Sequence, residues 1–155
     1  MHMPKPDASH ELMHALAGNW TGDERMHPSP WDPAGGTASA RMTGRVALGG
    51  FAVIGDYEQR RGGQVTFTGH SVHTIDPATK EHVLHWFDCM GSGAEQFRGS
   101  WQGQRLVLTS QGPQGHMRVI YELAGKDTLI SKMEMSQDGK KWSALVDATY
   151  RRQRD

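Results

Sequence analysis

Short extended segments separated by tight-turn signals recur along most of this chain. Nineteen glycines punctuate the 155 residues, and apolar and polar side chains alternate between them, which is the pattern of half-buried strands. Pairs such as Gly49-Gly50, Gly62-Gly63 and Asp138-Gly139 are typical hairpin turns. We expect strands near residues 19–27, 37–48, 51–61, 64–75, 82–89, 94–101, 104–111, 116–124, 128–136 and 142–151.

About ten strands joined by hairpins predict an antiparallel up-and-down sheet, and an open sheet would leave two unpaired edges. Closure into an all-β barrel removes both edges and leaves room for a small ligand. The alternative is a two-sheet sandwich with Greek-key links, but the longer crossovers that it needs are hard to find. We therefore expect one domain, residues 1–155, with residues 1–7 flexible.

A single helix is expected over residues 8–17, with Ser9 as N-cap and Gly18 as terminator. Trp20 follows directly and lies between Gly18 and Gly22. We expect Trp20 to close the barrel floor against this helix.

Composition limits the partners and the compartment. Lys and Arg together number 17, as do Asp and Glu, so the chain lacks the basic excess of a nucleic-acid-binding protein. No apolar run approaches the roughly 20 residues of a membrane span, and the N-terminal segment lacks the features of a signal peptide. Cys89 is the only cysteine, which favours a reducing, cytoplasmic location.

Several long stretches together resemble a known family. GNWTGDERMHPSPW, the glycine pair before FAVIGDYEQR, FTGHSVHTIDPATKEHVLHWFDCMG and WSALVDATYRR cover much of the chain. They resemble the bacterial family called domain of unknown function 1579, in the calycin superfamily with lipocalins, fatty-acid-binding proteins and nitrobindins. The resemblance implies a calycin-like barrel with a cavity.

The chain departs from that family at two positions. Lys80 stands where the family usually has glycine, which predicts a left-handed backbone there, and Thr74-Ile75 replaces a Gly-Tyr pair. Nitrobindins bind haem through a histidine near the C-terminus. Residues 117–155 contain no histidine, so haem is not expected by that route.

The register of the central hairpin follows by counting if Asp76 pairs with Glu81. One face then carries Gly69, Ser71, His73, Leu84, Trp86 and Asp88, and the other carries Thr68, His70, Val72, His85, Phe87 and Cys89. Small residues opposite Trp86 and a carboxylate favour the first face as the lumen. A slip of one residue would reverse this assignment.

A lumen of that kind is mostly apolar with a few polar anchors. Trp86 offers stacking area, His73 or His70 a hydrogen bond, and Asp88 needs a partner such as Arg98 because an unpaired buried carboxylate is costly. That pair is either structural or part of the site. The candidate ligand-binding residues are Ser71, His73, Trp86, Asp88, His70, Arg98, Tyr57, Tyr121 and Met133.

Neither a metal nor another cofactor is expected. His70 and His73 are three residues apart, as are His82 and His85, so each pair points to opposite faces of its strand. At most two of these histidines share a face, and no third ligand is apparent.

Three functions fit these features. The leading hypothesis is a barrel that binds a small hydrophobic or amphipathic metabolite in its lumen. The second is an enzyme in which a lumen histidine (His70, His73 or His85) acts as general acid or base beside Asp88 or Glu122. The third is an interaction protein with a filled lumen that forms a homodimer through a sheet face.

Overall fold

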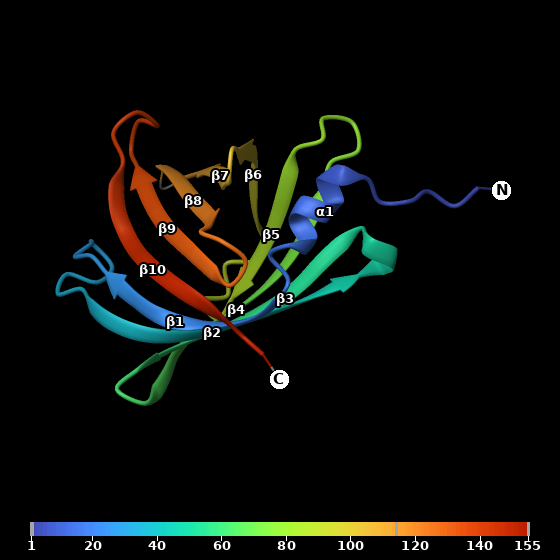
Figure 1. Cartoon of the computed structure of the whole chain (residues 1–155). Coiled ribbons are helices and arrows are strands. Elements are labelled where there is room, and N and C mark those ends of the chain that lie inside the picture. The colour runs from blue at the N-terminus through green and yellow to red at the C-terminus, as the bar shows by residue number, and fades with distance from the viewer. Residues whose placement is uncertain (1, 114, 155) are drawn as a thin grey trace.

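The strands form a β-barrel that closes on itself (Figure 1). The computed structural model describes residues 2–113 and 115–154. In it the elements are α1 (Ala8–His14), β1 (Gly18–Met26), β2 (Gly36–Ala47), the 3₁₀ turn η1 (Leu48–Gly50), β3 (Ala52–Arg61), β4 (Gln64–Ile75), β5 (His82–Asp88), β6 (Glu95–Gln102), β7 (Arg105–Gly112), β8 (Gly115–Leu123), β9 (Thr128–Ser136) and β10 (Ser143–Gln153).

Each strand pairs antiparallel with its neighbours in sequence, and β1 also pairs with β10 to complete the ring. The predicted barrel is therefore confirmed, and the sandwich alternative is wrong. The predicted strand ends lie within two residues of the observed ones. Such agreement follows from turn chemistry, because the Gly-rich connections leave little freedom in where a strand stops.

The helix is shorter than expected and ends at His14. Asp7, rather than Ser9, is its N-cap, because the Asp7 carboxylate accepts from the Ser9 N–H while His10 closes the capping box. α1 lies against β3 and β4 (Figure 1), with Met13 fully buried on that side. Among the described residues, no helix has the length and apolar character needed to cross a bilayer.

Trp20 closes the barrel beside α1, as predicted. Its side chain is 1% exposed, and its Nε1 donates a hydrogen bond to the carbonyl oxygen of Leu16 at 3.1 Å. The Arg152 guanidinium lies 4.2 Å from the centroid of the Trp20 ring, a cation–π contact. We call this closure, formed by α1, Leu16, Trp20 and Arg152, the floor.

The register of the β4–β5 hairpin is also confirmed. Ser71 lies opposite Trp86 and His73 opposite Leu84, because the Asp76 N–H donates to the Glu81 carbonyl oxygen at 2.8 Å and closes the turn. Lys80 adopts the predicted left-handed backbone, with φ of 64°.

Gly69 explains why Trp86 can lie flat on the inner wall of the sheet. A Cβ atom at position 69 would lie 2.2 Å from the nearest atom of the Trp86 ring. This is shorter than the distances that Cβ atoms keep from other heavy atoms in proteins. The absence of a side chain at position 69 therefore makes the space for the indole.

Candidate functional site

The lumen contains a cavity of about 430 Å³, within the roughly 300–1,000 Å³ typical of small-molecule sites. Its wall is mostly aliphatic and aromatic, and includes Leu84, Trp86, Phe97, Met117, Val119 and Met133. Strand alternation creates this wall, since every second residue of each strand faces inward. The interior is thus open in its middle rather than packed from end to end.

Most of the candidate residues from the sequence come together at this cavity. Those that line it are Tyr57, Ser71, His73, Trp86, Asp88, Tyr121 and Met133. They come from strands β3, β4, β5, β8 and β9. Their participation in binding stays a prediction.

His70 does not reach the cavity, so its expected hydrogen bond to a lumen ligand is wrong. Its neighbours Gly69 and Ser71 face inward, and alternation turns His70 outward. There its Nδ1 lies 2.8 Å from Oδ1 of Asp56, and both side chains are largely exposed.

The expected pair between Asp88 and Arg98 is also wrong. Arg98 lies opposite Val83 on the outer face near the β4–β5 turn, far along β5 from Asp88. Its guanidinium donates to Oδ2 of Asp76 at 2.8 and 3.1 Å and lies 3.4 Å from Glu81.

Asp88 instead finds its partners close by. Its Oδ2 accepts a hydrogen bond from Nε1 of Trp86 at 2.9 Å, and its Oδ1 accepts from the backbone N–H of Met90 at 3.0 Å. The carboxylate thereby fixes the indole against the cavity wall.

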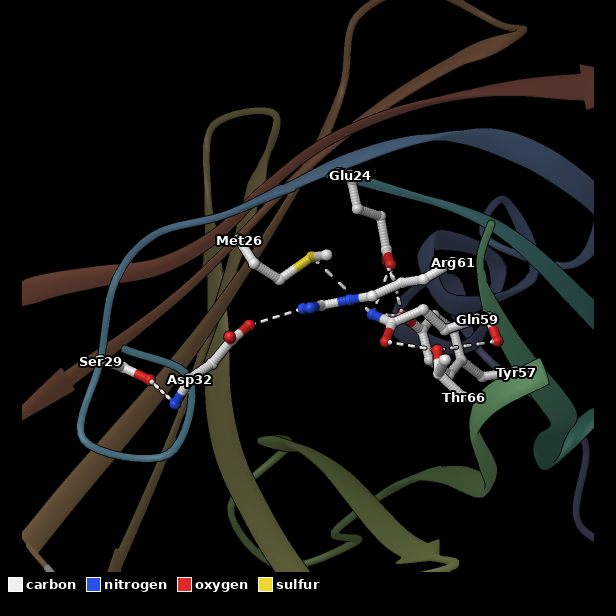
Figure 2. A network of polar contacts seen from close by, with 8 residues as sticks. All are labelled: Glu24, Met26, Ser29, Asp32, Tyr57, Gln59, Arg61 and Thr66. Carbon is white, nitrogen blue, oxygen red and sulfur yellow. Dashed lines mark hydrogen bonds and ion pairs between the residues drawn. The ribbon is translucent and has the colours of Figure 1, made fainter. Parts of the chain in front are cut away.

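Glu24 of β1 is the residue that sequence reasoning missed. It is 3% exposed, lines the cavity, and accepts from the hydroxyls of Tyr57 at 2.7 Å and Tyr150 at 2.5 Å and from Nε2 of Gln59 at 2.8 Å. Figure 2 shows Glu24 reaching toward Tyr57 and Gln59. We call Glu24, Tyr57, Gln59 and Tyr150 the Glu24 network.

The network has a defined orientation. The Thr66 hydroxyl donates to Oε1 of Gln59 at 3.3 Å, so the amide nitrogen of Gln59 faces Glu24 (Figure 2). Burial, reinforced by the charge of Glu24, raises the pKa of both Tyr57 and Tyr150. Both phenols therefore stay protonated and act as donors at neutral pH.

Counting from Trp20 would have found Glu24. Alternation places Trp20, Gly22 and Glu24 on one face of the same strand, and Trp20 was already expected inside the barrel. What local sequence does not contain is the partner set, because Tyr57 and Tyr150 come from strands far away in the chain.

His73 lies where the cavity meets the floor side of the barrel. It is 5% exposed, and its Nε2 is 2.9 Å from Nδ1 of His82. Burial, with repulsion from His82 as the smaller cause, lowers the pKa of His73 to about 3. Burial, followed by the charge of His10, also lowers the pKa of His82, so both rings are neutral at pH 7.

The Tyr121 hydroxyl is a polar group of the cavity that is still available. It makes no hydrogen bond to any residue that the structure describes, although Tyr121 lines the cavity. Burial raises its pKa to about 12, so it can donate to or accept from a ligand.

The β1–β2 loop, residues 27–35, lies at the opposite end of the barrel from α1, which we call the mouth (Figure 1). Nη2 of Arg61 lies 2.6 Å from Oδ2 of Asp32 in this loop (Figure 2). Nε2 of His27 lies 2.6 Å from Oδ2 of Asp147. Trp31 at the loop tip is 58% exposed.

Two kinds of chemistry find no support in this arrangement. Within residues 2–113 and 115–154, no three His, Cys, Asp or Glu side chains are grouped to hold a metal ion.

The enzyme hypothesis expects a histidine–carboxylate pair in the lumen. The pairs in the described part of the chain are instead His10–Asp7, His27–Asp147 and His70–Asp56. No histidine of these pairs lines the cavity.

Comparisons with known proteins agree with the fold. The profile of a family described as "Protein of unknown function (DUF1579)" matches residues 5–152. The crystal structure of Rv2717c from M. tuberculosis has a TM-score of 0.71 at 14% identity, covering 96% of this chain and 99% of that one. The S-type phycobiliprotein lyase CPES from Guillardia theta has a TM-score of 0.62 at 10% identity, covering 94% and 92%. No curated protein sequence matches the chain.

Proposed function

This chain belongs to the DUF1579 family, and we propose that it is a small-molecule-binding protein that takes up an apolar or amphipathic metabolite in the lumen of its barrel. The observation that carries this proposal is the cavity of about 430 Å³ with a largely apolar wall. Such a cavity is costly to keep in a core, because each void forfeits packing contacts. A ligand that fills it would restore those contacts.

The arrangement of the polar groups in the cavity favours ligand binding without a catalysed reaction. The Asp88 carboxylate is engaged by Trp86 and Met90, and His73 contacts another histidine instead of a carboxylate. Neither arrangement resembles a general base oriented by an acid. Ser71 and Tyr121 offer hydroxyls that can orient a ligand.

A neutral apolar fluorophore tests the proposal directly. We expect saturable binding with about one site per chain, and native mass spectrometry of freshly purified protein should reveal any bound metabolite. Trp86→Ala should reduce the affinity for the fluorophore by roughly tenfold, since the substitution removes a large aromatic contact. Trp142→Ala is the matched control, because Trp142 packs against Arg118 and does not line the cavity.

The result that contradicts the proposal is specific. If neutral fluorophores of several chain lengths show no saturable binding to the wild-type protein, the lumen is not a ligand site. Equal affinity in the Trp86→Ala variant would move the fluorophore site away from this cavity.

A further inference from the structure

The charges around the cavity are all of one sign. Apart from three tyrosines whose phenols stay neutral, the inward-facing ionisable side chains of its lining are the carboxylates Glu24, Asp88 and Glu95 together with His73. Asp56 also borders the cavity, but its side chain points outward to His70. The described lining contains no lysine or arginine.

Glu24 has donors but no counter-ion. The groups that bind its oxygens are two phenols and one amide, all of them neutral. Among the described residues it forms no ion pair, whereas Arg61 extends to Asp32 (Figure 2). The hydrogen bonds stabilise a buried carboxylate without cancelling its charge.

The inward-facing arginines at the two ends do not supply the missing positive charge. Arg61 at the mouth is paired with Asp32 at 2.6 Å. Arg152 does not line the cavity, and its Nε lies 3.4 Å from Oδ1 of Asp127. His73 adds no charge at neutral pH, since burial keeps its ring unprotonated.

The cavity also offers groups that suit a cation or a hydrogen-bond donor. Trp86 and Tyr57 present aromatic surfaces, with ring centroids 6.0 Å apart, and aromatic faces attract cations. The Tyr121 hydroxyl has no partner among the residues described. Glu95 likewise makes no side-chain hydrogen bond within that part of the chain.

We propose that the ligand of the lumen is a cationic amphiphile, an apolar body that carries a protonated amine or comparable cationic group, and that the barrel discriminates against carboxylates. This inference rests on the proposed binding function. An anionic head group would approach three carboxylates in a partly desolvated space, where like charges repel strongly. A cationic head group near Asp88 and Glu95 gains the corresponding attraction, while its apolar body contacts the aliphatic wall.

The proposed preference for cationic ligands can be tested with three dansyl probes that have the same alkyl chain. One ends in a primary ammonium, one in a neutral amide and one in a carboxylate. At pH 7 and low salt we expect the ammonium probe to bind at least about tenfold more tightly than the carboxylate probe, with the amide between them. Added salt should narrow the difference, because charges near the mouth are screened.

Two variants test whether Asp88 and Glu95 cause the preference for the ammonium probe, and a third variant is the control. Asp88→Asn and Glu95→Gln should each reduce the ratio of ammonium to carboxylate affinity by about threefold or more, and the affinity of the amide probe for each variant gives the reference for any general loss of binding. Glu58→Gln removes an exposed carboxylate that is paired with Arg60 outside the barrel, and should leave the ratio unchanged. Melting temperatures of all variants check that each one folds.

The outcomes separate the two proposals. If the amide probe binds but the carboxylate probe binds as tightly as the ammonium probe, the cationic preference is overturned and the binding function stands. If the ratio is unchanged in both lumen variants, Asp88 and Glu95 do not provide the preference and the inference is overturned. If no probe binds, the proposed function fails, and this inference fails with it.

Discussion

The floor and the mouth of the barrel are closed by different interactions. At the floor, Trp20 and Met13 are fully buried, and burial of large apolar side chains is the strongest stabilising contribution in a fold. At the mouth, the β1–β2 loop is attached through Asp32–Arg61 and His27–Asp147, whose side chains are about one-quarter to nearly one-half exposed. Partly exposed pairs of this kind contribute little, typically below about 1 kcal/mol each.

The two ends therefore differ in how easily each could open to admit a ligand. Opening the floor would expose an indole and the helix packed behind it, whereas lifting the mouth loop breaks a few solvated polar contacts. Local openings occur where the free-energy cost is lowest. A ligand should therefore enter beside the β1–β2 loop and come to rest above Trp20.

The largest expected effect comes from removing the floor. Trp20→Ala should lower the free energy of unfolding by about 3–5 kcal/mol, as for other buried tryptophans, measured by urea denaturation. Trp31→Ala, at the exposed loop tip, is the control at the mouth and should change it by less than about 0.5 kcal/mol. Similar losses in the two variants would contradict the comparison.

The second effect is a pH dependence located on the floor side. The pKa of His73 is lowered from its ordinary 6.5 to about 3, so between these values the unfolded chain binds a proton that the folded chain does not. Stability therefore falls as the pH drops through that window. Between pH 6.5 and about pH 4, His73 alone would contribute a loss of about 3 kcal/mol, and His82, whose pKa is also lowered, would add to it.

Denaturation curves at several pH values measure this slope, with His73→Gln as the comparison. The carboxyl groups with lowered pKa values, Asp7, Asp76 and Asp138, start from an ordinary value of 3.8, so they lose their contribution mainly below the window. If the wild-type protein and His73→Gln have the same slope above pH 4, His73 is not the group responsible.

The Glu24 network lies between the two ends, and the third effect tests how much its hydrogen bonds contribute to the free energy of unfolding. Tyr150→Phe removes one donor from the buried Glu24 carboxylate and should cost about 1–3 kcal/mol. Tyr121→Phe removes a hydroxyl with no partner in the described chain, and should cost less than about 0.5 kcal/mol. Urea denaturation of both variants gives the comparison, and equal losses would argue against the network.

The contrast between local and distant pairing also explains what the sequence could predict. The β4–β5 register followed from one turn, because Asp76 and Glu81 are close in the chain and the rest is counting. Alternation from Trp20 places Glu24 inside the barrel, but its hydrogen-bond donors could not be predicted because they come from β3 and β10. Arg98 was misassigned because its parity and its position along β6 depend on strand pairing rather than on composition.

The smallest effect on stability is expected at the mouth, where it should instead appear in kinetics. Asp32→Asn weakens the contact to Arg61 and should lower the free energy of unfolding by less than about 1 kcal/mol. If this contact restrains a loop that limits entry at the mouth, the association and dissociation rates of the neutral dansyl probe should both rise in stopped-flow measurements, with little change in affinity. Glu58→Gln, which removes a carboxylate from an exposed pair on the outer wall, should leave both rates unchanged. Rates that respond equally to Asp32→Asn and to Glu58→Gln would mean that the loop does not control entry, and the distinction between a fixed floor and a movable mouth would then have to be given up.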